Sequence, residues 1–227
     1  MSYQIKLLGC FLNRRNKPAV KRLAQLLINR VAVVGAEHRK GLPHSAVYLT
    51  SPPVGNIVKG KRTCVIDGEA PFECNGAVIS RFATSHDCEG SSGYTFLMPD
   101  GKKISVCTDL GVVTEDVRKA ISGSDAVLIE SNHDVDMLNK GPYPPELKMR
   151  IMSEKGHISN NACSAELVRL LNSGTKRFIL GHLSQKNNTP LLALSSAEAA
   201  LADKGAKNGR DYLLSVAAPS ENRVTVI

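Results

Sequence analysis

Four polar clusters of this sequence carry the residue types that could hold a metal ion. Together they contain three histidines and several carboxylates, and each follows a short apolar run of the length of a β-strand. The clusters lie at residues 85–87, 108–109, 130–134 and 181–182. Imidazole nitrogens and carboxylate oxygens bind a divalent cation when several of them meet at about 2 Å from it. The spacing therefore predicts a metal site where the ends of four strands converge.

The elements that must bring these clusters together are short strands of one sheet. The apolar runs that precede the clusters span residues 77–82, 104–107, 126–129 and 177–180. Residues 94–98 and 103–107 flank a Pro-Asp-Gly turn sequence, which predicts a hairpin. Further strands are predicted at residues 47–50, 63–66, 211–217 and 223–227.

Helix signals alternate with strands in the second half of the chain. Thr114 is expected to cap a helix that stops at Gly123, because a hydroxyl can accept from the first free N–H groups. Hairpins followed by alternating strands and helices predict a layered α/β protein. The other predicted helices run over residues 18–34 (basic and amphipathic), over 145–154, from a cap at Ser159 or Asn160 to Gly174, and from the capping box Ser195-x-x-Glu198 to Gly205.

The composition indicates one substantial domain. The chain has 227 residues, 42% of them hydrophobic, which is enough for a core of its own. No apolar run approaches the ~20 residues of a membrane-spanning helix, and no secretory signal is expected. The six cysteines contain no Cys-x-x-Cys pair, and several lie in apolar runs, where a reduced cysteine acts as a small apolar side chain. We therefore expect a cytoplasmic protein with free thiols and no membrane partner.

Positive charge is concentrated at the start of the chain. Residues 1–44 hold nine Lys or Arg and one acidic residue, Glu37, whereas residues 45–227 hold 20 basic and 20 acidic residues. The whole net charge of +8 therefore lies in the first segment. Such a basic arm indicates either a nucleic acid or anionic surface as partner, or a segment foreign to the fold that follows. Both interpretations place a boundary near residue 45.

Each cluster also has a purely structural interpretation. His86 and His182 could be solvated loop residues, and Asp109 a turn former. The five polar residues 130–134 could form a turn that caps backbone amides, although loops at strand ends are where functional groups gather. Residues 156–161 precede a helix, where N–H groups favour either an anion or an ordinary cap.

In this order the clusters resemble the metallo-β-lactamase fold, and specifically its WalJ-like (YycJ-like) branch of metal-dependent hydrolases. LIESNHD combined with GHLSQKNN is specific to this branch, whereas SHD or TDLG alone is not. The resemblance covers roughly residues 46–227. The segments that carry it are SHD at 85–87, GYTF at 93–96, TDLG at 108–111, LIESNHD at 128–134, GHISN at 156–160 and GHLSQKNNTP at 181–190.

The resemblance implies an αββα sandwich with a dinuclear zinc or manganese centre, and a 5′→3′ DNA exonuclease or related phosphodiesterase activity. Carried over by motif, His86 ligates the first metal, Asp109 bridges both metals and His182 ligates the second. Two metals suit phosphodiester cleavage, because one generates hydroxide while both neutralise the charge that builds up on phosphorus. The residues implied beside Asp109 at the catalytic rim, near the scissile phosphate, are His133, Asp134, His157 and Asn160.

The sequence departs from this family on its amino-terminal side. The family motif His-x-His-x-Asp-His, which supplies four metal ligands ahead of the region matching residue 46, does not occur in it. A replaced segment and a divergent domain both explain the departure. We therefore predict an atypical basic segment at 1–45 and an incomplete metallo-β-lactamase-like domain at 46–227. Two functions stay open: a metal-dependent hydrolase with an impaired metal site, and a non-catalytic scaffold that binds nucleic acid through the basic segment.

Overall fold

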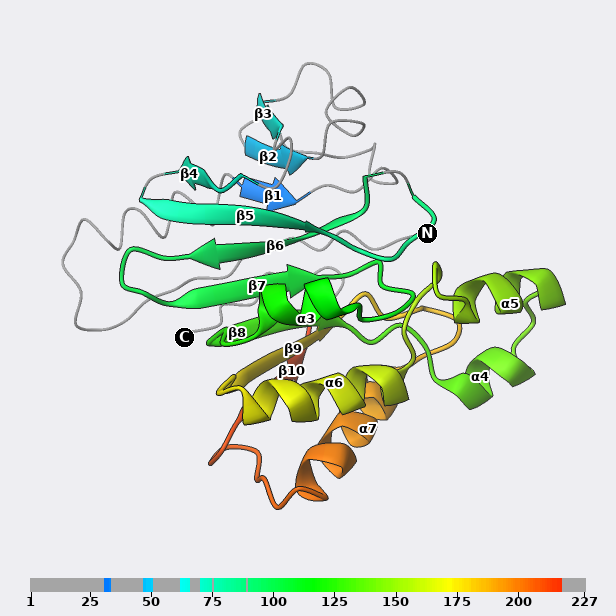
Figure 1. Ribbon diagram of the computed structural model, residues 1–227. Helices are drawn as coiled ribbons and strands as arrows, with labels where there is room; N and C mark the ends of the chain where they lie inside the picture. The colour runs from blue at the N-terminus through cyan, green and yellow to red at the C-terminus, as the bar shows by residue number, and fades with distance from the viewer. Residues whose placement is uncertain are drawn as a thin grey trace.

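Two β-sheets organise the computed structural model, which describes residues 31–33, 47–50, 62–65, 70–74, 76–88 and 90–217 (Figure 1). The larger sheet has seven strands in the order β10-β9-β8-β7-β6-β5-β4. The smaller, three-stranded sheet is parallel. Its strands are β1 (Val31–Val33), β2 (Val47–Thr50) and β3 (Arg62–Val65).

The seven-stranded sheet is antiparallel on one side and parallel on the other. The antiparallel neighbours are β4 (Phe72–Cys74), β5 (Ala77–Ala83), β6 (Ser92–Leu97) and β7 (Lys103–Cys107). The parallel neighbours are β7, β8 (Ala126–Glu130), β9 (Arg177–Gly181) and β10 (Leu213–Val216). The four strands predicted ahead of the polar clusters are confirmed, and so is the hairpin formed by β6 and β7.

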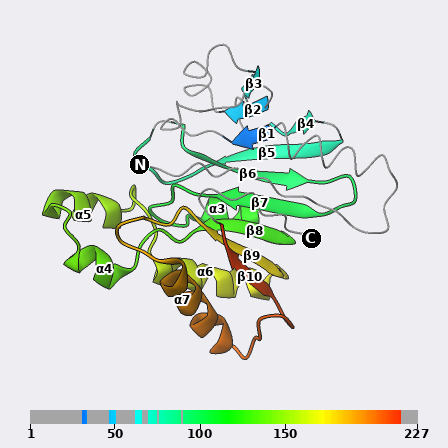
Figure 2. The same ribbon diagram turned by 180° about the vertical axis from the view of Figure 1, so that it is seen from behind.

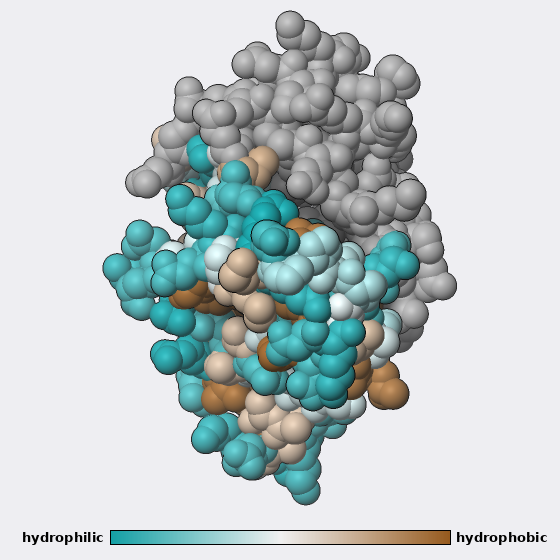
Figure 3. Space-filling view, turned by 90° about the vertical axis from the view of Figure 1, so that its right-hand side faces the viewer, coloured by the Kyte–Doolittle hydropathy of each residue, from teal (hydrophilic) through white to brown (hydrophobic). Residues whose placement is uncertain are grey.

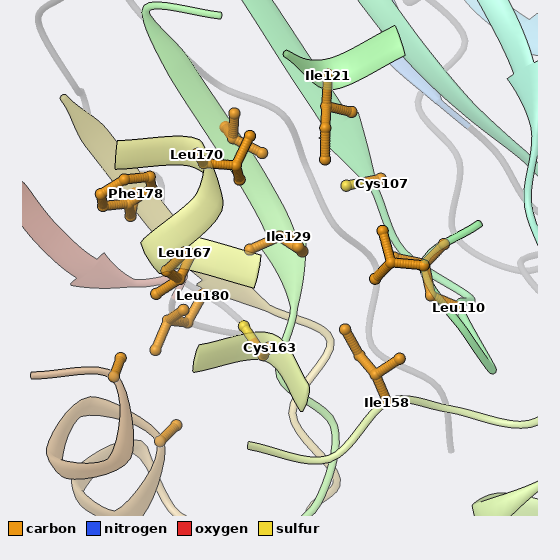
Figure 4. Packing of buried hydrophobic residues seen from close by; sticks show 14 of the residues in the cluster. Cys107, Leu110, Ile121, Ile129, Ile158, Cys163, Leu167, Leu170, Phe178 and Leu180 are labelled. Atoms are coloured by element: carbon orange, nitrogen blue, oxygen red, sulfur yellow. The ribbon is translucent and has the colours of Figure 1, made fainter. Parts of the chain in front are cut away.

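The main core lies between the parallel strands and three helices (Figure 4). Ile129 of β8 and Phe178 and Leu180 of β9 belong to it, and these alternate positions point to one face of the sheet. The predicted layered α/β architecture is therefore confirmed. The helices that complete this core are α3 (Glu115–Ile121), α6 (Asn160–Asn172) and α7 (Pro190–Ala202).

Helix starts follow local capping chemistry, with one departure from the prediction. The side chains of Thr114 and Ser159 accept from backbone N–H groups at the starts of α3 and α6, as predicted. The predicted start of α7 at Ser195 is wrong, because Thr189 caps that helix six residues earlier. Pro190 follows the cap, and its fixed φ and missing N–H suit a first helical position.

Other differences concern segments with weak local signals. Residues 31–33, expected at the end of a helix over 18–34, form strand β1, where they pair with β2; two of the three are the β-branched residue valine, which favours a strand. Residues 18–30 and the predicted strand 223–227 lie outside the described residues. The short elements β4 and α4 (Val135–Lys140) were not predicted. Within the described chain, every helix is too short or too polar to span a bilayer.

The strand ends that carry the polar clusters share one edge of the large sheet. β5, β7, β8 and β9 run in the same direction, so their carboxyl ends meet there. Helices α4 and α5 (Pro145–Met152) flank this edge in both views (Figures 1 and 2). The side of the molecule shown in Figure 3 is largely hydrophilic in its described part, with apolar residues scattered among polar ones.

Candidate metal centre

Four side chains from four separate segments meet at this edge. His86 lies in the loop after β5, Asp109 after β7, His157 between α5 and α6, and His182 directly after β9. Asp109 Oδ1 lies 3.7 Å from His86 Nε2 and 3.7 Å from His182 Nε2. The ring of His157 neighbours both other rings, with centroids 4.8 Å from His86 and 5.2 Å from His182. The predicted convergence of the strand-end clusters is therefore present.

These separations suit a shared cation. Two ligand atoms of one tetrahedral ion lie roughly 3.4 Å apart when each bond is about 2.1 Å long. The 3.7 Å separations around Asp109 come close to this value and are too long for hydrogen bonds. In two groups of described residues, one ligand atom from each residue lies within 4.8 Å of those of the others. The groups are His86, Asp109 and His157, and Glu130, His157 and His182.

Nδ1 of each imidazole faces an oxygen that can only accept a hydrogen bond. His86 Nδ1 lies 3.0 Å from the carbonyl oxygen of Gly156. His157 Nδ1 and His182 Nδ1 lie 2.8 and 2.5 Å from Glu130 Oε1. Because a carbonyl or an ionised carboxylate has no proton to donate, all three Nδ1 atoms must carry theirs. In the neutral rings the lone pair is then on Nε2, which is how a ligating imidazole is prepared for a metal.

Glu130 is the buried acceptor that organises two of these rings. Its side chain is 0% exposed, and its Oε2 accepts from the N–H of Leu110 at 2.7 Å, which leaves Oε1 for the two imidazoles. Burial raises the pKa of Glu130, but the charge of His182 and the hydrogen bonds from His157 and His182 together outweigh burial and lower it to about 2. Glu130 is therefore an anion at neutral pH.

Left-handed backbone occurs at two of the candidate ligands. Among the described residues, Asp109 (φ 58°) and His182 (φ 57°) are the non-glycine residues with positive φ. This conformation costs an L-residue roughly 1–2 kcal/mol, less for Asp than for His. It persists where the surrounding structure fixes it, and such positions cluster at functional sites.

A carboxylate–guanidinium pair borders His86. Asp87 accepts two hydrogen bonds from Arg150 of α5, at 2.5 and 2.9 Å, and the hydrogen bond from Arg150 lowers the pKa of Asp87. Asp87 Oδ1 also lies 3.5 Å from His86 Nε2. Gly156 therefore holds the His86 ring, and Asp87 ties the loop after β5 to α5.

Two glycines shape the loop after α5: Gly111 lets this loop approach the loop after β7, and Gly156 lets it fold back on the end of α5. A Cβ atom on Gly111 would overlap the carbonyl of Glu154, and one on Gly156 would overlap the carbonyl of Arg150. Neither position has room for a side chain. The close contact brings the carbonyl of Gly156 within reach of His86.

The remaining predicted residues, His133, Asp134 and Asn160, belong to neither of the two candidate ligand groups found among the described residues. His133 is 2% exposed; burial lowers its pKa, and its Nδ1 has no hydrogen-bond partner within the described chain. Asp134 caps α4, with its Oδ1 accepting from the N–H of Met137 at 2.8 Å. Asn160 is 2% exposed rather than open to a substrate. The catalytic roles expected of His133 and Asp134 stay predictions, as do those of the convergent residues.

Glu130 and Arg150 are the residues whose contribution the sequence did not reveal. Glu130 was noted only as part of a polar cluster. The available signal was an acidic residue at the end of an entirely apolar strand, where a carboxylate is buried only if it is paired. Arg150 offers no such signal, because its partner lies 63 residues away in the sequence.

Two curated relatives are exodeoxyribonucleases. WalJ of Streptococcus pneumoniae is 41% identical over 115 residues, which make up 51% of this chain and 42% of that protein. YycJ of Bacillus anthracis is 36% identical over 127 residues, which make up 56% of this chain and 48% of that protein. The matches thus span about half the length of these relatives. No family model matches the chain.

Solved structures of low sequence identity share the fold. Zn²⁺-bound PqqB from Methylobacterium extorquens has a TM-score of 0.55 at 18% identity, over 83% of this chain and 70% of that one. The metallo-β-lactamase fold protein YhfI from Bacillus subtilis has a TM-score of 0.52 at 11% identity, over 78% of this chain and 62% of that one. The chain therefore has the metallo-β-lactamase fold and is similar in sequence to the WalJ-like branch that its motifs indicated.

Proposed function

We propose that this chain carries the metal-binding edge of a DNA exonuclease that cleaves phosphodiester bonds in the 5′→3′ direction. The observation that carries the proposal is the convergence of four side chains from distant segments, with the carboxylate of Glu130 behind two of the imidazoles. The similarity to two exodeoxyribonucleases supports DNA as the substrate. The convergent side chains are His86, Asp109, His157 and His182.

The donor set fits zinc or manganese. Both ions accept imidazole nitrogen and carboxylate oxygen, and a ligating histidine needs its other nitrogen held as Glu130 and Gly156 hold it. His86 would hold the first ion, Asp109 would bridge both, and His182 would hold the second. Bound there, the ions would activate a water and neutralise charge at phosphorus.

The chain's own residues contribute orientation and a place for a proton. Glu130 keeps a proton on Nδ1 of both His157 and His182, so neither ring can turn without losing a charge-assisted hydrogen bond. We assign His157 Nε2, which carries the lone pair, as the atom that accepts a proton during the reaction. His133, buried close to this pair, would donate or accept a hydrogen bond at the same edge.

The ligand set of this chain is incomplete compared with the family pattern. The sequence contains no His-x-His-x-Asp-His, so each ion would have one terminal ligand and share Asp109. A catalytic zinc normally has about three protein ligands. We therefore infer that this chain binds metal weakly and cleaves DNA slowly unless further ligands complete the site.

Calorimetric titration of the full chain with zinc and with manganese tests the proposal. We expect binding weaker than micromolar that disappears in Asp109→Asn, because the bridging carboxylate is lost while Asn tolerates the same backbone conformation. Binding of two ions at sub-micromolar affinity would contradict the incomplete site. Identical binding by the wild type and by Asp109→Asn would mean that Asp109 does not ligate the ion. That result would contradict the proposed metal centre and the hydrolase proposal that rests on it.

A second candidate function is a non-catalytic scaffold that holds nucleic acid. The net charge of +8 within residues 1–44, which lie largely outside the described residues, favours it. Affinity from phosphate contacts would fall steeply with salt and ignore base sequence. A nuclease assay with added manganese separates the two functions, because a scaffold would bind DNA without shortening it.

A further inference from the structure

Three polar side chains form a buried cluster beside the candidate metal centre. Ser131, Asn160 and Asn188, here called the amide cluster, are 1%, 2% and 6% exposed. Ser131 lies in the loop after β8, Asn160 at the start of α6, and Asn188 in the loop before α7. The cluster therefore joins three segments that are far apart in the sequence.

The amide cluster is hydrogen-bonded throughout. Asn160 Oδ1 accepts from Ser131 Oγ at 2.7 Å and from Asn188 Nδ2 at 2.8 Å, and Asn160 Nδ2 donates to Asn188 Oδ1 at 3.0 Å. Asn188 Nδ2 also faces the backbone carbonyls of Ser131 and Asn132, at 2.8 and 3.1 Å, so its two N–H groups are shared among three acceptors. Asn188 Oδ1 accepts from the N–H of Thr189 at 2.9 Å. Such a satisfied network fixes its members in one arrangement.

The segments tied together by the cluster are the ones that present His182 to Glu130. Ser131 directly follows Glu130, and its N–H donates to the carbonyl of Gly181 at 2.9 Å. Asn132 Nδ2 donates to the carbonyl of His182 at 2.9 Å. The backbone that carries the imidazole of His182 is thereby held against the end of β8.

The segment that presents His157 is fixed in the same way. The N–H of Asn132 donates to the carbonyl of Ile158 at 3.1 Å, one residue beyond His157. The N–H of Asn160 donates to the carbonyl of His133 at 2.8 Å. The backbone of the loop with His157 is thereby held against residues 132 and 133, and the side chain of Asn160 links the end of this loop to the amide cluster.

We propose that Asn160 and Asn188 are positioning residues that keep His157 and His182 on the carboxylate of Glu130. One oxygen accepts from both rings, at 2.8 and 2.5 Å, so both loops must be placed correctly at once. The loops have no regular structure of their own, and the reciprocal amide pair supplies the constraint. The consequence for metal binding rests on the proposed function, whereas the consequence for the imidazole hydrogen bonds does not.

NMR spectroscopy of the full, metal-free chain labelled with ¹⁵N-histidine tests this role. Besides a signal from His86, whose Nδ1 faces the carbonyl of Gly156, the wild type is expected to show two exchange-protected Nδ1–H signals, assigned to His157 and His182 through His157→Gln and His182→Gln. Asn160→Ala and Asn188→Ala should each lose both signals, and zinc affinity should fall about tenfold, as when a supporting partner is removed. Ser131→Ala removes one hydrogen bond of the cluster and should weaken the exchange protection of the two Nδ1–H groups less. This variant replaces an asparagine variant that fails to fold.

Leu170→Ala is the matched control, because Leu170 is a core residue of the same helix α6 and has no part in the amide cluster. It should lower stability and keep both signals. Equal loss of the signals in Leu170→Ala would mean that the asparagines affect the imidazoles only through the stability of the fold, and would overturn the proposal. Intact signals in the folded asparagine variants would overturn it too. If the wild type shows both signals but binds no zinc, the proposed function fails while the positioning role is supported.

Discussion

Glu130 and Glu166 are two buried carboxylates whose charge is stabilised by different partners. Glu130 is 0% exposed and accepts from two imidazoles and a backbone N–H. Glu166 of α6 is 4% exposed, accepts from Arg118 Nε at 3.0 Å and belongs to neither group of candidate ligands. Both satisfy the rule that a buried charge needs a partner, so burial alone does not mark a site.

The chemistry of the partner separates the two positions. Arg118 is permanently charged and has no lone pair, so its pair with Glu166 can only hold α3 against α6. An imidazole can change its protonation, and with Nδ1 occupied by a carboxylate it can bind a metal through Nε2. The buried acid beside histidines is therefore the one suited to function, and the one beside arginine is suited to fold stability.

The largest expected effect is that of Glu130→Gln. Glutamine has one acceptor oxygen and one amide donor, so either the N–H of Leu110 or both imidazoles would face a donor. Breaking a buried charged arrangement in this way costs roughly 3–5 kcal/mol. We expect that loss in urea unfolding at neutral pH, with zinc affinity reduced about 10- to 100-fold.

Glu166→Gln is the control for that substitution. Its amide oxygen can still accept from Arg118, which is about one-third exposed, so a loss of only about 1 kcal/mol is expected, with unchanged zinc affinity. Equal effects of the two substitutions on zinc affinity would erase the distinction between the two acids.

The second prediction concerns acid. The pKa of Glu130 is lowered from 4.5 to about 2 in the fold, so its contribution is complete above the unfolded-state value and is lost as the pH falls from about 4.5 to about 2. The contribution is of the order of 3 kcal/mol. The wild type should therefore lose more stability than Glu130→Gln over this interval, measured by urea unfolding at successive pH values.

Other carboxylates titrate in the same interval, but they are common to both proteins. The pKa of Asp87 is lowered by its hydrogen bond with Arg150, and that of Asp125 is lowered because its hydrogen bonds with Lys102 and Lys103 outweigh burial. The difference between the two curves isolates Glu130. Parallel curves would mean that Glu130 gains nothing from its histidines.

The sequence predicted the positions of the strand-end residues because their signals are local. An apolar run followed at once by a polar cluster marks the end of a buried strand, and parallel strands end at one edge. The segments around His86, Asp109 and His182 each show this pattern, and the structure brings them together. The hairpin and the caps at Thr114 and Ser159 were equally local.

The partners of these residues could not be predicted in the same way. Glu130 contacts His182, 52 residues away in the sequence, and Asp87 contacts Arg150, 63 residues away. No local sequence pattern at one residue of either pair identifies its partner. The start of α7 shows that even a local signal misleads when a second one competes with it. Ser195 and Glu198 imitate a capping box, but they lie inside a helix that Thr189 and Pro190 begin.

The smallest expected effect concerns the pair of Arg118 and Glu166. In a double-mutant cycle of Arg118→Met and Glu166→Gln, urea unfolding should give a coupling free energy of about 1 kcal/mol or less, because the guanidinium is partly solvated in the native state. The imidazole signals and zinc affinity should not change in any member of the cycle. A coupling of about 3 kcal/mol or more would make this pair as strongly interdependent as Glu130 and its histidines. Partner chemistry would then no longer distinguish the buried acid at the metal centre from the one that holds two helices together.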